Sequence, residues 1–170
     1  CSRHRSNLGT TLPQRLPWLE NALQGLAFWI GHRQSLFRDY PLSEGALVAE
    51  TCNLIAASLR QQLVLLPERM YKNLVLSGTT LNGIGRLARA DLVVCTEDVK
   101  AIDRDGCLFP HVQFVIEVKR SSAPKALVDE DFKRLHQLLM QSQGVRCFSI
   151  IVSEGAAPTR FVYDGKSKLT

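Results

Sequence analysis

The chain has 170 residues, of which 45% are apolar, and this length favours a single domain with its own core over two domains. Its formal net charge is +5, which is compatible with a phosphate-rich partner without identifying one. No apolar run reaches the roughly 18 residues that a membrane-spanning helix needs, so we expect no membrane partner.

The cysteines are five in number, and none of them is spaced as in a C-x-x-C motif. Three of them, Cys52, Cys95 and Cys147, lie inside apolar runs, where cysteine behaves as a small hydrophobic residue. We therefore expect no disulfide framework and no structural zinc site. Because no secretory leader is visible either, the protein is predicted to be intracellular, in the cytoplasm or in the nucleoid or nucleus.

Residues 1–40 are expected to form a basic tail followed by an accessory helix, outside a main domain of residues 41–170. Apolar side chains recur at helical spacing between Pro17 and Ile30. Proline suits the first helical turn, and Gly31 suits the position just after the last turn. The segment is thus predicted to be a helix added to the main domain.

A second helix is predicted from Glu44 to Leu63, with Ser43 as its N-cap. Glu50 falls at the edge of its apolar stripe, from where a carboxylate can reach a site at the end of a sheet. A solvated glutamate without a role is an equal alternative. Glu44 lies nearer the centre of the stripe, but in the first turn, where an acid also favours the helix dipole. We take Glu50 as the helical carboxylate of a site, and leave open whether Glu44 has that role instead.

The remainder of the chain is predicted to consist of strands, turns and one more helix. The glycines between Ser77 and Gly85 lack the pattern of a phosphate-binding loop, and Asp103 and Asp105 lack the other ligands of an EF-hand, so both regions are predicted to be turns. Strands are predicted at residues 71–76, 87–96, 111–120, 147–152 and 161–163, and a helix at residues 129–143.

Charged side chains interrupt two of these apolar strands. Asp91 lies early in one strand, and Glu117 and Lys119 lie at the end of the next. Strand side chains alternate between faces, so Glu117 and Lys119 point the same way. Both are costly in an apolar strand unless they are paired or bind a metal. If the strands pair, two carboxylates and an ammonium meet, which favours a hard-cation site with a lysine close to it.

This arrangement resembles the signature of the PD-(D/E)XK nuclease superfamily, which has the restriction-endonuclease-like fold. The first motif reads Ala90-Asp91 and lacks the proline, whereas the second is intact as Glu117-Val118-Lys119. The resemblance extends over roughly residues 43–163 when the predicted elements are included. It implies an α/β fold with an αβββαβ core, in which helices flank a central mixed sheet of four to five strands, and the N-terminal helix is an addition.

The resemblance further implies a metal-dependent nuclease that hydrolyses phosphodiester bonds, in DNA rather than RNA. Mg²⁺, with Mn²⁺ as a substitute, would be bound by Asp91, Glu117, the Val118 carbonyl and Glu50. Lys119 would position or help to deprotonate the attacking water. Whether the protein is a homodimer or part of a larger chain stays open. Candidate substrate-binding residues are Arg86, Arg89 and Arg120, which flank the acids, and Lys133 and Gln137 on the later helix.

Two other interpretations remain at this level. The first alternative is a catalytically inactive, nuclease-like module that binds nucleic acid or protein within a larger protein. The retention of both Glu117 and Lys119 argues against loss of the site. The second alternative is an unrelated α/β domain in which these two residues form a surface ion pair at a strand end.

Overall fold

The structure is a computed structural model that describes residues 15–37, 40–101, 106–142 and 144–154. Within these ranges the core elements follow one another as helix, three strands, helix and strand, preceded by an additional helix. The predicted α/β fold with an αβββαβ core is therefore confirmed. The N-terminal tail, Asp103 and Asp105, and the strand predicted at 161–163 lie outside the described residues.

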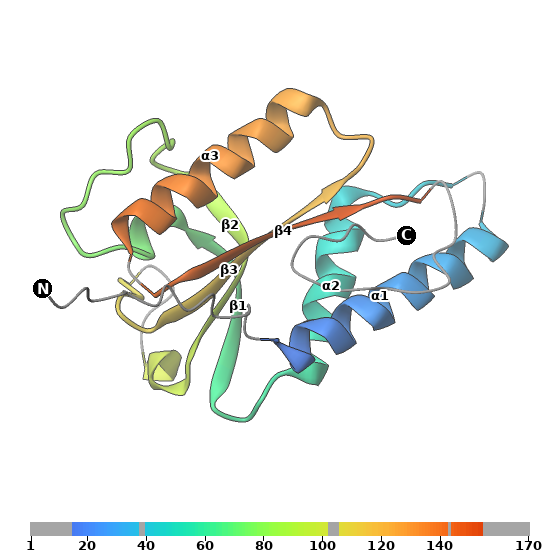
Figure 1. The fold of residues 1–170 in the computed structure, drawn as a ribbon, viewed down its shortest axis with the longest axis horizontal. Coiled ribbons are helices and arrows are strands. Elements are labelled where there is room, and N and C mark those ends of the chain that lie inside the picture. The colour runs from blue at the N-terminus through green and yellow to red at the C-terminus, as the bar shows by residue number, and fades with distance from the viewer. Residues whose placement is uncertain (1–14, 38–39, 102–105, 143, 155–170) are drawn as a thin grey trace, which may run out of the picture.

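The sheet has four strands in the order of the sequence, and it is mixed (Figure 1). The first three strands form an antiparallel meander, and the last strand lies parallel to the third. This leaves the second and third strands, which carry the predicted acids, at the centre of the sheet. The strands are β1 (Leu63–Met70), β2 (Arg89–Thr96), β3 (Val112–Arg120) and β4 (Arg146–Val152).

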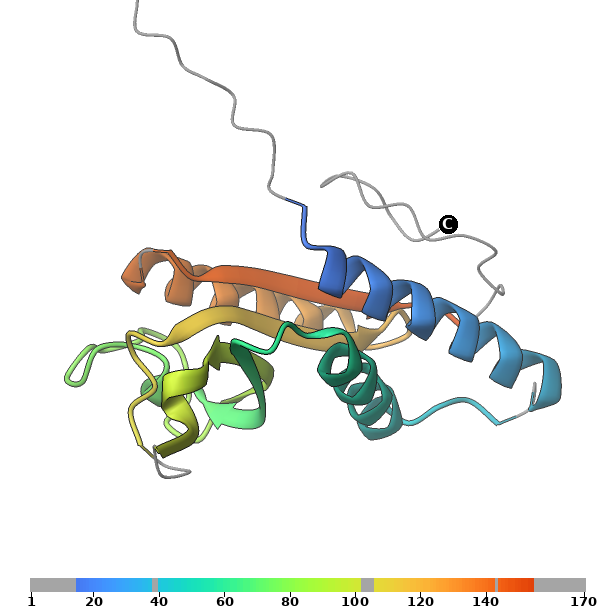
Figure 2. The ribbon, with the colours of Figure 1, turned by 90° about the horizontal axis from the view of Figure 1, so that it is seen from below.

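Helices cover both faces of this sheet, as Figures 1 and 2 show from two directions. Two helices, α1 (Pro17–Leu36) and α2 (Glu44–Ser58), share one apolar core with the strand residues Leu92, Ile116 and Val118. The helix α3 (Lys125–Gln141) packs on the other face, against a second core. Because β3 is covered on both faces, a charge on it is withdrawn from water unless it lies at the strand end.

The predicted accessory helix is integral to the first of these cores. Trp18, Leu19 and Leu26 of α1 are buried in it. The indole of Trp18 packs edge-on against the ring of Phe114 in β3, with 5.2 Å between the ring centroids. In the part of the chain that the structure describes, no helix is both long enough and apolar enough to span a membrane.

The first strand was predicted in the wrong place. It runs from Leu63 to Met70, whereas residues 71–73 form a short 3-10 turn and α2 already ends at Ser58. Two features prevent this strand from being predicted from the sequence. Its leucines continue the helical spacing of α2, and Pro67 is unfavourable within a strand. β1 is an edge strand of the sheet, where a residue without an N–H is tolerated. The other elements lie where predicted, with α1 and α3 longer than expected.

Candidate metal and catalytic site

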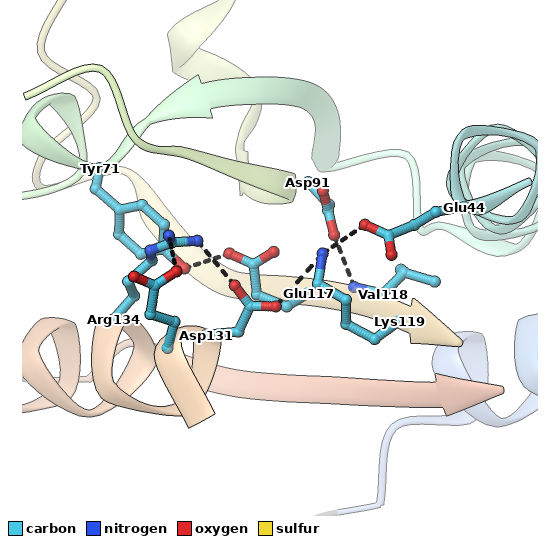
Figure 3. Close-up of polar contacts among 9 residues, drawn as sticks. Glu44, Tyr71, Asp91, Glu117, Val118, Lys119, Asp131 and Arg134 are labelled. Atoms are coloured by element: carbon cyan, nitrogen blue, oxygen red, sulfur yellow. Dashed lines mark hydrogen bonds and ion pairs between the residues drawn. The ribbon is translucent and has the colours of Figure 1, made fainter. Parts of the chain in front are cut away.

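Asp91 and Glu117 face each other across the two central strands. β2 and β3 are antiparallel, and Leu92 pairs with Ile116, so the next step along the ladder places Asp91 opposite Glu117. Directly opposed residues have Cβ atoms roughly 4.5–5.5 Å apart. One Asp91 oxygen, Oδ2, accepts a hydrogen bond from the Val118 backbone N–H at 2.8 Å (Figure 3). The charge of Asp91 raises the pKa of Glu117, so the two carboxyl groups lie close enough to interact. Two such carboxylates repel each other unless a proton or a cation lies between them.

Glu117 is almost completely buried, with 2% of its surface exposed. Burial, and then the negative charge of Asp91, raise its pKa to about 8, although a hydrogen bond from the Tyr71 hydroxyl opposes this shift. The same environment raises the pKa of Tyr71, so its phenol remains a donor. In the metal-free protein Glu117 therefore holds a proton at neutral pH, which a cation would have to displace.

Lys119 lies between carboxylates from both helices that flank the site (Figure 3). Its Nζ is 2.5 Å from Oε1 of Glu44, at the start of α2, and 3.5 Å from Oδ2 of Asp131, on α3. Burial lowers the pKa of Lys119, but the bond to Glu44 and the charges of Asp131 and Asp91 outweigh it, so the pKa is raised. The amine is therefore held in its charged form.

Asp131 is a site residue that the sequence analysis missed. Its exposure is only 2%. Oδ1 binds Arg134 at 2.8 Å, while Oδ2 has no hydrogen bond and faces the Lys119 ammonium at ion-pair distance. Burial raises the pKa of Asp131, and the charges of Lys119 and Arg134 oppose that shift. The carboxylate thus links two cations on the α3 side of the site.

The helical carboxylate at the site is Glu44, not the preferred candidate Glu50. They are six positions apart, which is about 600° of helical rotation, so their side chains leave α2 about 120° apart. Glu44 contacts Lys119, and it lines an open cleft with other residues of the same face of α2. Glu50 is half-buried on another part of the helix and does not line that cleft.

The candidate substrate-binding residues do not converge on the acids. Arg89 forms an exposed ion pair with Glu68 at 3.6 Å, and Arg120 is paired with Glu154 at 3.0 Å. Arg86 is exposed on the loop before β2. On α3, Lys133 is exposed and Gln137 is half-buried, whereas the inward-facing positions are those of Asp131, Leu135 and Leu138.

No family model, curated protein or solved structure matched this chain. The chemistry of the site must therefore be inferred from its own geometry.

A magnesium ion fits the ligand set that the strands provide. Within the described ranges, no group of three or more histidine, cysteine, aspartate or glutamate side chains is placed to hold a metal ion. Mg²⁺ does not need such a group, because it binds one or two carboxylates and keeps waters and substrate phosphate as its other ligands. Asp91 and Glu117 on the two central strands would supply those carboxylates, and a cation would displace the proton that the raised pKa of Glu117 favours. Glu44, which contacts Lys119 and lines the cleft together with Asp91, is a further carboxylate nearby.

An open cleft of about 740 Å³ leads to the site from the side of α2 and β1. We call it the α2–β1 cleft. Glu44 and Asp91 lie among its lining residues, while Glu117, Lys119 and Asp131 do not. The cleft therefore gives solvent access to one edge of the charged cluster. Its remaining lining residues are Gly45, Val48, Ala49, Cys52 and Asn53 of α2 and Pro67, Glu68 and Arg69 of β1.

Proposed function

We propose that this chain is a metal-dependent nuclease of the PD-(D/E)XK type that hydrolyses phosphodiester bonds in DNA. The observation that carries the proposal is the pair of Asp91 and Glu117 on adjacent strands, with the charged Lys119 two residues beyond Glu117 on β3. A buried carboxylate whose pKa is raised to about 8 is costly to ionise, so its presence favours a cation-binding role over a structural one.

The two carboxylates would hold Mg²⁺ between them, with Asp91 on the side that the cleft reaches. When bound, Mg²⁺ would polarise a phosphodiester and make an adjacent water more acidic. The hydrogen bond from the Val118 N–H fixes the direction of the Asp91 carboxylate before any ligand arrives. Tyr71 does the same for Glu117. These two hydrogen bonds would therefore orient both carboxylates before a shared cation binds.

Lys119 would act as a charged donor. Because it is paired with Glu44 and Asp131, it is an ammonium, and an ammonium has no lone pair with which to accept a proton. It can orient a water molecule and stabilise negative charge that develops on the phosphate oxygens. Asp131, itself held by Arg134, restrains this ammonium from the α3 side.

Nicking of supercoiled plasmid DNA tests the proposal. We expect the wild type to nick DNA with Mg²⁺ or Mn²⁺ and to stop when EDTA is added. Asp91→Ala and Lys119→Ala should each lower the rate by about 10²–10⁴-fold, because each removes a group that acts on the reacting phosphate.

Matched controls are available on α3. Asp129 and Lys125 form an exposed ion pair with each other, at 2.7 Å. Asp129→Ala and Lys125→Ala remove the same side-chain types away from the site and should leave nicking unchanged. A folded wild type that binds DNA with no metal-dependent cleavage would refute the nuclease and support the inactive binding module. Equal losses in the site and control variants would also refute the assigned roles.

A further inference from the structure

The α2–β1 cleft has two chemically distinct ends. Glu44 and Asp91 make the end beside Lys119 acidic, and Figure 3 shows both side chains directed towards that lysine. Away from this end, α2 lines the cleft with the small side chains of Gly45, Val48, Ala49 and Cys52 and with the amide of Asn53. A cation therefore suits the inner end, whereas the wall formed by α2 suits an uncharged group.

The shape of the apolar part follows from the spacing of the lining residues on α2. Val48 and Cys52 are four residues apart, as are Gly45 and Ala49, so they form two adjacent rows on one helix face. Their small size leaves space between α2 and the edge strand, where Pro67 provides a flat apolar surface. The volume of about 740 Å³ lies in the range of roughly 300–1,000 Å³ that is typical of ligand sites.

The charges in the cleft select against a second phosphate. The cleft is lined by three carboxylates, those of Glu44, Glu68 and Asp91, and by one guanidinium, that of Arg69. Glu44 and Glu68 are paired with Lys119 and Arg89, which do not line the cleft, so carboxylates outnumber cations at its surface. A phosphate is therefore favourable only at the inner end, where a bound cation would reverse the local charge. An uncharged, planar group with hydrogen-bonding edges fits the remaining volume, and Asn53 offers an amide that can pair with such an edge.

We propose that the α2–β1 cleft binds an unpaired nucleobase next to the phosphate that is cleaved. This inference rests on the proposed nuclease function and names its substrate class: single-stranded DNA, or duplex DNA with a nucleotide turned out of the stack. Proteins hold such bases between apolar side chains and read their edges with hydrogen bonds. A base stacked inside an intact duplex cannot enter the cleft while its own phosphate lies at Asp91.

Cysteine footprinting tests occupancy without altering the site. Cys52 lines the cleft and Cys107 is exposed elsewhere, and both are free thiols. Alkylation is followed at each thiol by mass spectrometry, with Ca²⁺ in place of Mg²⁺ to slow cleavage. A single-stranded oligonucleotide should slow the labelling of Cys52 several-fold and leave that of Cys107 unchanged. Protection of Cys52 by a lysine-rich peptide and not by the oligonucleotide would overturn the proposal in favour of a cationic occupant.

Filling the cleft provides the second test. Ala49→Phe places a ring in the cleft, and Ala57→Phe places the same ring on an exposed part of α2 outside the lining. Binding is measured with single-stranded DNA that carries 2-aminopurine, whose fluorescence falls when the base stacks. Ala49→Phe should weaken binding about tenfold and abolish the fluorescence change, whereas Ala57→Phe should match the wild type. Asn53→Ala, which leaves the cleft open, should weaken binding less.

The outcomes separate this inference from the proposed function. Wild-type cleavage together with unchanged binding by Ala49→Phe and Asn53→Ala would refute the nucleobase site and leave the nuclease intact. Protection of Cys52 and loss of the 2-aminopurine signal in Ala49→Phe, without cleavage by the wild type under any metal, would support the base site and refute the nuclease. Equal binding of blunt duplex and single strand would overturn the preference for an unpaired base.

Discussion

The two sides of Lys119 differ in how they hold negative charge. Towards α3, Glu117 and Asp131 are buried, and each is neutralised by a proton or by neighbouring cations. Towards α2, Glu44 and Asp91 lie at the surface of the α2–β1 cleft, where water reaches them. The buried side therefore controls the response to pH and metal, whereas the open side is where a substrate enters.

Substitution of Glu117 should have the largest effect on how the unfolding free energy depends on pH. In the native state its pKa of about 8 lies above its ordinary value of 4.5, so between these limits the folded protein binds the extra proton. The unfolding free energy of the metal-free protein should then fall as pH rises from 4.5 to 8, by the order of a few kcal/mol. Glu117→Gln should remove this part of the slope. Urea unfolding across that pH range measures it.

The effect of Mg²⁺ on the unfolding temperature provides a control for the role of Glu117. At pH 8, Mg²⁺ should raise the unfolding temperature of the wild type and have little effect on Glu117→Gln, because the amide is a poor ligand. An equal slope with pH in both proteins would show that another group is responsible.

Substitution of Asp131 should have the next largest effect, on the unfolding free energy and on the rate of cleavage. Asp131→Asn keeps the shape but leaves Lys119 and Arg134 near each other without the charge between them. We expect a loss of about 1–3 kcal/mol in unfolding free energy, and slower cleavage with little change in DNA affinity. Asp129→Asn, in an exposed pair with Lys125, should cost well under about 1 kcal/mol. An equal loss of unfolding free energy in the two variants would show that the charge of Asp131 does not stabilise the protein by separating Lys119 and Arg134.

On the open side, the comparison of Glu44 with Glu50 tests which helical carboxylate takes part. Glu44→Gln weakens the contact with Lys119 and should lower kcat/KM for oligonucleotide cleavage about tenfold. Glu50→Gln, on the same helix but outside the cleft, should behave as the wild type. A larger loss in Glu50→Gln would reverse the assignment.

The smallest effect concerns the rim of the cleft. Glu68 has φ of 52°, in the left-handed region, and it lies between Pro67 and Arg69, where the pairing of β1 with β2 skips one residue. Glu68→Gly should stabilise the fold by about 0.5 kcal/mol relative to Glu68→Ala, because glycine adopts this conformation without strain. Both variants lose the same exposed pair with Arg89, so thermal unfolding of the two compares backbone effects alone. Equal melting temperatures for Glu68→Gly and Glu68→Ala would contradict the proposed backbone strain at residue 68.

The central strands could be predicted from the sequence because β2 and β3 are continuous apolar runs, which few other elements produce. β1 could not, since its leucines continue the helical spacing of α2 and Pro67 is unfavourable in a strand interior. On α3 the apolar residue Phe132 is 49% exposed while the adjacent Asp131 is buried, so hydrophobicity does not reveal the inward position of Asp131. The contact between Glu44 and Lys119 joins residues 75 positions apart, which no local pattern encodes.

The hydrogen bond that directs Asp91 comes from the main chain at residue 118. Every amino acid except proline supplies that donor, so the orientation of the first acid is independent of which side chain stands there. Residue 118 is therefore free to be chosen for its fit into the core beneath the sheet, where Val118 is completely covered. Residue 118, between Glu117 and Lys119, can therefore be replaced by other apolar residues without loss of the hydrogen bond that orients the Asp91 carboxylate.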